Sequence, residues 1–139
     1  MKMQRWVRTF GVLAVLAMFL SCGDDPEPPT APTPPPTVTE TFSGTVGRNS
    51  VSLHNFTTQA SGTITATLTT LLPDSELLVG MSIGTWNGTA CQLVIVKTDA
   101  KQSTVLTGGV STLGNLCVTI YDVGNIVNPV SYEITIVHP

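Results

Sequence analysis

The sequence predicts an all-β protein, an antiparallel β-sandwich or jelly roll of about eight short strands, with a small closed β-barrel as the alternative. Three observations lead to this prediction. Residues 40–139 are rich in threonine, valine, isoleucine, serine and glycine and contain no helix-like stretch. Apolar and polar residues alternate in short runs, as in strands with one face in a core. Glycine, proline, asparagine and aspartate separate these runs, and such residues favour turns.

The clearest predicted strand is residues 63–69, in which threonine alternates with an apolar residue. The alternation places one face in the core and a row of threonines on the other. A threonine row could also bind a regular surface such as polysaccharide or ice, but threonine suits any solvated strand face. The closing segment, residues 131–136, alternates in the same way. The other predicted strands are Thr41–Val46, Ser50–Thr57, Leu77–Ile83, Cys91–Lys97, Thr104–Gly108 and Leu116–Tyr121.

Four segments carry a resemblance to a known family: Phe42–Val46, Gly62–Leu68, Leu116–Asp122 and Tyr132–Ile136. Together they resemble the bacterial pre-peptidase carboxy-terminal domain (PPC-like), a secreted jelly-roll-like β-sandwich. The resemblance spans nearly all of residues 41–137 and rests on hydrophobic pattern, not on a catalytic signature. It implies an accessory module that binds matrix or substrate. Some members bind calcium, but the acidic residues of this domain are scattered, so no metal ligand is assigned.

The first 21 residues have the layout of a secretory signal peptide. Lys2, Arg5 and Arg8 precede an apolar run from Phe10 to Leu20. A membrane-spanning helix needs about 20 apolar residues and this run is about half as long, so we expect it to be removed. The alternative is an amphipathic or buried helix, although the run offers no polar face.

The junction Phe19-Leu20-Ser21-Cys22 resembles the bacterial lipoprotein signal, in which a small residue precedes a cysteine that is acylated and becomes the amino terminus. Phe19 stands three positions before the cysteine, where a leucine is most often found. The resemblance implies a diacylglycerol and usually a third chain on Cys22, and stable anchoring needs more than one chain. Gly23 after the cysteine is similar to the outer-membrane sorting pattern of Gram-negative bacteria. We therefore expect lipidation at Cys22 and a place in the bacterial cell envelope, in the outer membrane, facing the periplasm or the surface. The alternative is a free or disulfide-bonded cysteine.

Residues 22–39 are predicted to be a disordered proline-rich linker between the lipid anchor and the domain at residues 40–139. Seven of the eleven residues from Pro26 to Pro36 are proline. Proline favours an extended helix that rises about 3.1 Å per residue, so some 15 residues would span roughly 45 Å. The alternative is a proline-rich ligand of a recognition module.

The charge of the mature chain limits its partners. Without residues 1–21 the chain keeps three basic and nine acidic residues, which gives a net charge of −6. Because nucleic-acid affinity comes largely from cations that neutralise phosphates, no nucleic-acid partner is expected. The same charge disfavours contact between the domain itself and an anionic membrane surface.

Cys91 and Cys117 are the only cysteines beyond Cys22. An even pair in a small exported domain predicts a disulfide, with two buried free thiols as the alternative. Closing a loop of about 25 residues should stabilise the domain by roughly 3 kcal/mol. Two cysteines with the distant His54 and His138 are too few for a zinc site.

The sequence contains no motif that predicts catalysis. Both histidines lack a motif-like cysteine or aspartate partner and are expected at the surface or at strand ends. Asp74 and Glu76 follow Pro73 and are expected to be solvated turn residues. We therefore expect neither an enzyme, nor a cofactor, nor a bound metal.

The remaining signal for function is a candidate binding loop. Trp86 adjoins an Asn87-Gly88 turn, where an exposed aromatic ring can stack on a sugar or anchor a protein contact. The competing interpretation is that Trp86 caps one end of the core. Tyr121 is a candidate neighbour, so the predicted ligand contacts are Trp86, Asn87 and Tyr121. The expected function is a membrane-anchored binding or adhesion module with a polysaccharide or envelope-protein partner; the alternative is a structural envelope lipoprotein that contacts other envelope proteins.

Overall fold

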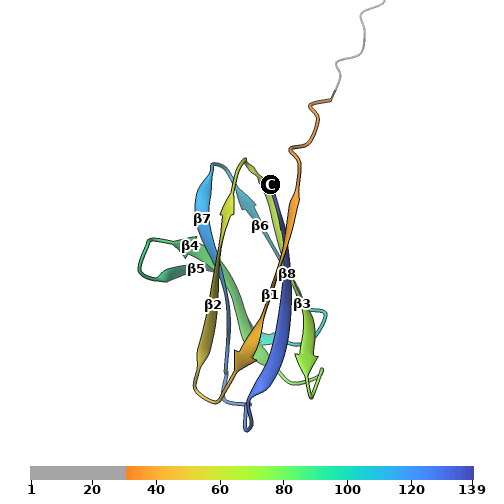
Figure 1. The fold of residues 1–139 in the computed structure, drawn as a ribbon, viewed down its shortest axis with the longest axis vertical. Coiled ribbons are helices and arrows are strands. Elements are labelled where there is room, and N and C mark those ends of the chain that lie inside the picture. Colours follow the sequence, from red (N-terminus) through yellow and green to blue (C-terminus); the bar gives the residue numbers. More distant parts are fainter. Residues whose placement is uncertain (1–30) are drawn as a thin grey trace, which may run out of the picture. The chain divides into compact units, whose positions relative to one another are not determined.

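The computed structural model describes residues 31–139, and these residues form strands and no helix (Figure 1). No element among them can therefore cross a membrane as a helix. The predicted signal peptide, Cys22 and the linker up to residue 30 lie outside the described residues. The strands are β1 (Val38–Val46), β2 (Val51–Thr58), β3 (Gly62–Leu72), β4 (Val79–Trp86), β5 (Cys91–Ala100), β6 (Val105–Val110), β7 (Gly114–Tyr121) and β8 (Val130–His138).

The eight strands form two four-stranded sheets, with the orders β1-β8-β3-β6 and β2-β7-β4-β5. All pairings are antiparallel. Each sheet ends in two edge strands, so the domain is a sandwich and the closed-barrel alternative is wrong. Six of the seven connections join strands of different sheets, and only the β4–β5 hairpin joins neighbours within one sheet.

Strand β3 shows how alternation builds the core. Ile64, Ala66 and Leu68 are buried, while the threonines between them are partly exposed. The strand is longer than predicted, because the pairing with β8 shifts between Leu68 and Thr70. Such a bulge inserts one residue and changes which residues face inward. It breaks the sequence alternation without ending the strand, and Leu71 is buried beyond it.

The core lies between the two sheets and is almost entirely aliphatic. Its buried members are Val46, Phe56, Ile64, Ala66, Leu68, Leu71, Val79, Met81, Ile83, Ala100, Leu106, Leu116, Val118, Ile120, Ile126, Val130, Tyr132, Ile134 and Ile136. Edge strand β5 contributes only Ala100 to this set, with Ile95 packed partly buried against it. Most of β5 therefore lies outside the core.

The outer faces of the two sheets differ in chemistry. The β1-β8-β3-β6 face carries threonines in cross-strand rows, for example Thr41 beside Thr135 and Thr135 beside Thr67. On the other sheet, the exposed residues of β2 include Val51 and Leu53. The first face is typical of a solvated sheet, whereas apolar side chains on the second face favour a contact surface.

Candidate ligand pocket

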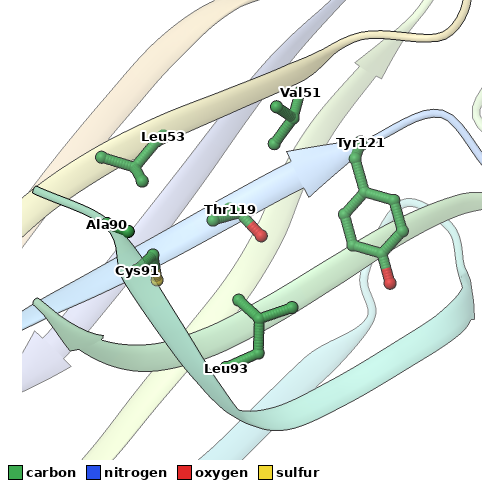
Figure 2. Close-up of a pocket in the computed structure, with 7 residues that line it drawn as sticks. All are labelled: Val51, Leu53, Ala90, Cys91, Leu93, Thr119 and Tyr121. Carbon is green, nitrogen blue, oxygen red and sulfur yellow. The ribbon is translucent and has the colours of Figure 1, made fainter.

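An open pocket of about 450 Å³ lies on the outer face of the β2-β7-β4-β5 sheet (Figure 2). Side chains from β2 and β7 form its floor, and the end of the β4–β5 connection with the start of β5 forms its roof. The lining residues are Val51, Leu53, Ala90, Cys91, Leu93, Thr119 and Tyr121. None of these seven residues carries a charge at neutral pH.

The floor follows from the pairing of β2 with β7. Val51 pairs with Tyr121, and Leu53 pairs with Thr119. Paired residues of neighbouring strands point to the same side of a sheet, so these four side chains share one face. Val51 is 63% exposed and Leu53 is 38% exposed. The next residue of β2, His54, has the opposite phase, and its side chain points between the sheets toward Phe42 and Tyr132.

The roof exists because β5 passes closely over β4. A Cβ atom at Gly84 would lie 2.2 Å from the carbonyl oxygen of Gln92, which is too close for any side chain. Glycine at this position therefore allows the start of β5 to lie on the sheet. Figure 2 shows the start of β5, which carries Cys91, crossing the β7 strand.

A disulfide joins Cys91 on β5 to Cys117 on β7, with the Cα atoms 5.9 Å apart. The predicted pairing is confirmed, and the free-thiol alternative is wrong. Strand β4 separates these two strands in the sheet order. The bridge therefore ties the roof to a strand that is not its neighbour.

Tyr121 forms one wall of the pocket. A Cβ atom at Gly80 would lie 2.1 Å from the Tyr121 ring, so the ring packs directly on the β4 backbone. Below the pocket the Ser82 and Thr119 hydroxyls form a 2.6 Å hydrogen bond with each other, and both residues are buried. Because one of these hydroxyls donates to the other and both residues are buried, the lining presents mostly carbon surface.

The structure separates the residues that the sequence suggested as ligand contacts. Tyr121 pairs with Gly80, whereas Trp86 is the last residue of β4, six positions further along that strand. At about 3.3 Å per residue the separation is roughly 20 Å. Only Tyr121 lines the pocket.

Trp86 and Asn87 occupy the end of the β4–β5 hairpin, which projects to the left in Figure 1. Trp86 is half-buried and pairs with Cys91, but it is not a member of the core cluster, so it does not cap the core. The Asn87 side-chain oxygen accepts hydrogen bonds from the backbone N–H groups of Thr89 and Ala90, at 2.9 and 2.8 Å. Asn87 therefore shapes the turn.

Sequence reasoning missed Val51, Leu53 and Leu93 as pocket residues. A signal was present in β2, because Val51 and Leu53 share the phase of Asn55 and Thr57 and not that of the buried Phe56. Two large apolar side chains on the solvated phase of a strand indicate a contact surface.

The two histidines face the interior and lie away from the pocket lining. His54 is in the middle of β2, where its ring stacks on Phe42 at 4.9 Å between centroids and lies 2.7 Å from the Tyr132 hydroxyl oxygen. Burial lowers the pKa of His54. His138 ends β8 but is only 2% exposed, with Nε2 2.9 Å from Glu40 Oε1. The expectation of surface or strand-end histidines is thus wrong for His54, which lies in mid-strand, partly buried against Phe42 and Tyr132. His138 is a strand-end residue, as expected, but it is buried.

The acidic residues that the sequence placed in turns do lie in turns. Asp74 is exposed and accepts a hydrogen bond from the Glu76 N–H at 2.9 Å.

Asp122 holds the loop after β7, because its carboxylate accepts hydrogen bonds from the N–H groups of Asn49, Gly124, Asn125 and Ile126. These hydrogen bonds lower the pKa of Asp122, and the bond from the Asn49 N–H has the largest effect. Within residues 31–139 no three His, Cys, Asp or Glu side chains come together as metal ligands.

These features define the class of protein as a disulfide-bonded antiparallel β-sandwich with an apolar pocket on one outer face. No protein-family model matches the chain, and no curated protein matches its sequence. The resemblance to the pre-peptidase carboxy-terminal domain therefore stays a prediction.

Proposed function

We propose that this protein is a lipid-anchored lipoprotein of the bacterial cell envelope whose β-sandwich works by non-covalent binding and not by catalysis. Acyl chains on Cys22 hold it in the membrane, in our proposal the outer membrane, and residues 22–39 act as the spacer. The order of basic residues, short apolar run, cysteine and proline-rich segment supports this part of the proposal.

The observation that carries the binding function is the uncharged, apolar pocket of about 450 Å³. Its lining favours an apolar group over a sugar, because sugar hydroxyls need several polar partners and the Ser82 and Thr119 hydroxyls already bond each other. The ligand we propose is a cluster of apolar side chains on another envelope protein.

The expected affinity follows from the surface available. Fully burying one leucine-sized side chain contributes about 1.5–3 kcal/mol, and a micromolar complex needs about 8 kcal/mol. One side chain in the pocket is therefore not enough. The partner must also cover neighbouring exposed side chains of this face, such as Val51 at 63% exposure.

The alternative, a structural envelope lipoprotein in permanent contact with other envelope proteins, is favoured by apolar exposure outside the pocket. Val94 is 69% exposed and Val127 is 82% exposed. A permanent complex would cover these residues together with the pocket.

The test uses a photo-crosslinking amino acid at Leu53, in the pocket, or at Thr67, on the opposite outer face, in cells that make the full chain. The protein crosslinked from Leu53 is identified, purified and titrated with the lipid-free mature chain. We expect reversible binding that Leu53→Asp weakens at least about tenfold, since a buried charge without a partner is costly, and that Thr67→Asp leaves unchanged. Equal crosslinking from both positions would contradict the proposal, and a complex that never dissociates would support the structural alternative.

A further inference from the structure

The disulfide attaches the roof of the pocket, at the start of β5, to β7 across the intervening strand β4. Cys117 pairs with Gly84 on β4, and Cys91 pairs with Trp86 on the same strand. The bridge between the two cysteines therefore runs over the outer surface of β4. It holds the start of β5 against that surface, directly above the site where Gly84 leaves room.

The roof contributes little to the core. From Gln92 to Val94 the residues of β5 are exposed, and Ala100, at the far end, is the only β5 residue in the core cluster. As an edge strand, β5 is paired only with β4. Segments with few buried contacts open at low free-energy cost, whereas the sandwich core opens only on global unfolding. Without the bridge, the start of β5 would therefore be held mainly by its pairing with β4.

The bridge can be reached from one side. Cys91 is partly exposed and lines the pocket, whereas Cys117 is completely buried. An attacking thiolate that enters the pocket meets the sulfur of Cys91 first.

From these three observations we infer that the Cys91–Cys117 disulfide is a redox latch that builds the pocket and can be opened without unfolding the sandwich. The reductant is a dithiol. One thiolate of the dithiol attacks Cys91 Sγ, a mixed disulfide forms there, and Cys117 leaves as a thiolate that takes up a proton. The second thiol of the reductant then displaces Cys91, so that the dithiol is oxidised to a disulfide and both cysteines are reduced.

The same coupling means that a bound ligand affects the redox equilibrium of the disulfide. If the oxidised form binds an apolar ligand more tightly, the ligand must favour the oxidised form by the same factor. A ligand in the pocket would in addition cover Cys91 and slow the attack. The ligand part of this inference rests on the proposed function, whereas the latch itself does not.

The first test measures backbone amide exchange in the mature lipid-free chain before and after reduction with dithiothreitol, and in the double variant Cys91→Ser, Cys117→Ser. We expect exchange in residues 84–95 to rise by at least about tenfold while exchange in β3 and β8 keeps its protection. Unchanged exchange in residues 84–95 would overturn the latch. Global unfolding of both the reduced protein and the variant would also overturn it, because the bridge would then be a structural staple.

The second test titrates the neutral apolar fluorophore N-phenyl-1-naphthylamine into the oxidised and the reduced chain, with Leu53→Asp as the control. We expect binding only to the oxidised wild-type chain, and slower reduction by dithiothreitol when the probe is bound. Equal binding to both redox forms would overturn the latch. Failure of the oxidised chain to bind would instead contradict the proposed apolar site, and the exchange measurement would still decide the latch.

Discussion

At the scale of single residues, two glycines on β4 decide what can lie on the outer face of its sheet. Gly84 allows β5 to cross, and Gly80 allows the ring of Tyr121 to pack on the backbone. Neither glycine has a positive φ. Their role is close approach of other groups and not backbone freedom.

Gly80→Ala should therefore destabilise the domain. The new Cβ atom would lie 2.1 Å from the Tyr121 ring, so the ring would have to leave its place. Overpacking of this kind costs about 1–3 kcal/mol, which urea unfolding can measure. The matched control is Gly109→Ala on β6, where no atom lies within 4 Å of the added Cβ. Equal losses in the two variants would contradict this account.

The carboxylate of Asp122 makes the stability of the domain depend on pH in the acid range. Its pKa is lowered by backbone hydrogen bonds, so its contribution to stability is present above the unfolded pKa of about 3.9 and is lost as pH falls through the lower folded pKa. We expect Asp122→Asn to melt below the wild-type protein at pH 5 and the gap between the two melting temperatures to shrink by pH 3. A gap that stays constant over this range would show that the carboxylate charge contributes nothing.

At the scale of elements, strands such as β3 and β8 have a core phase and a solvent phase, so neighbouring residues of one strand differ sharply in importance. Leu68 is completely buried, and Thr67 beside it is partly exposed on the threonine face. Strands β4 and β7 lack this alternation, because Val79–Gly84 and Leu116–Ile120 are buried throughout. Strand β5 is mostly exposed, since it serves the roof of the pocket more than the core.

Leu68→Ala should lower the free energy of unfolding by about 2–5 kcal/mol, because it leaves a cavity between the sheets. Thr67→Ala should cost less than about 1 kcal/mol, since the lost contacts are on a solvated face. Chemical denaturation of the two variants measures both effects. Similar values for the two positions would mean that the assignment of the two faces of β3 is wrong.

At the scale of the whole molecule, the proposal joins a lipid anchor, a spacer and a binding domain in one chain. The spacer would let the pocket meet partners roughly 45 Å from the membrane. The membrane anchoring in this proposal depends on Cys22, because its thiol would form the thioether to the lipid.

Cys22→Ser should therefore abolish labelling with radioactive palmitate and move the protein from the membrane fraction to the soluble envelope fraction. Fractionation followed by detergent partitioning measures the change. Cys91→Ser is the control for loss of a cysteine and should leave the lipid in place. A Cys22→Ser protein that still partitions into detergent would rule out the lipoprotein proposal.

The sequence alone predicted an all-β domain of about eight strands and the core phase of strands such as β3 and β8, because burial at every second residue is a local property that such a segment displays by itself. The structure was needed to choose the sandwich over the closed barrel, since closure depends on which strands pair. The sequence also indicated the pairing of Cys91 with Cys117, since no other pairing was open within the domain. The tertiary structure decided which strands are neighbours, where β5 crosses β4 and hence where the pocket lies. These features depend on contacts between segments far apart in the chain, such as β2 with β7 and Tyr121 with Gly80. Alternation along one strand carries no record of its partner, so the sequence offered Tyr121 as a candidate neighbour of Trp86 and only the fold showed that the two residues lie apart.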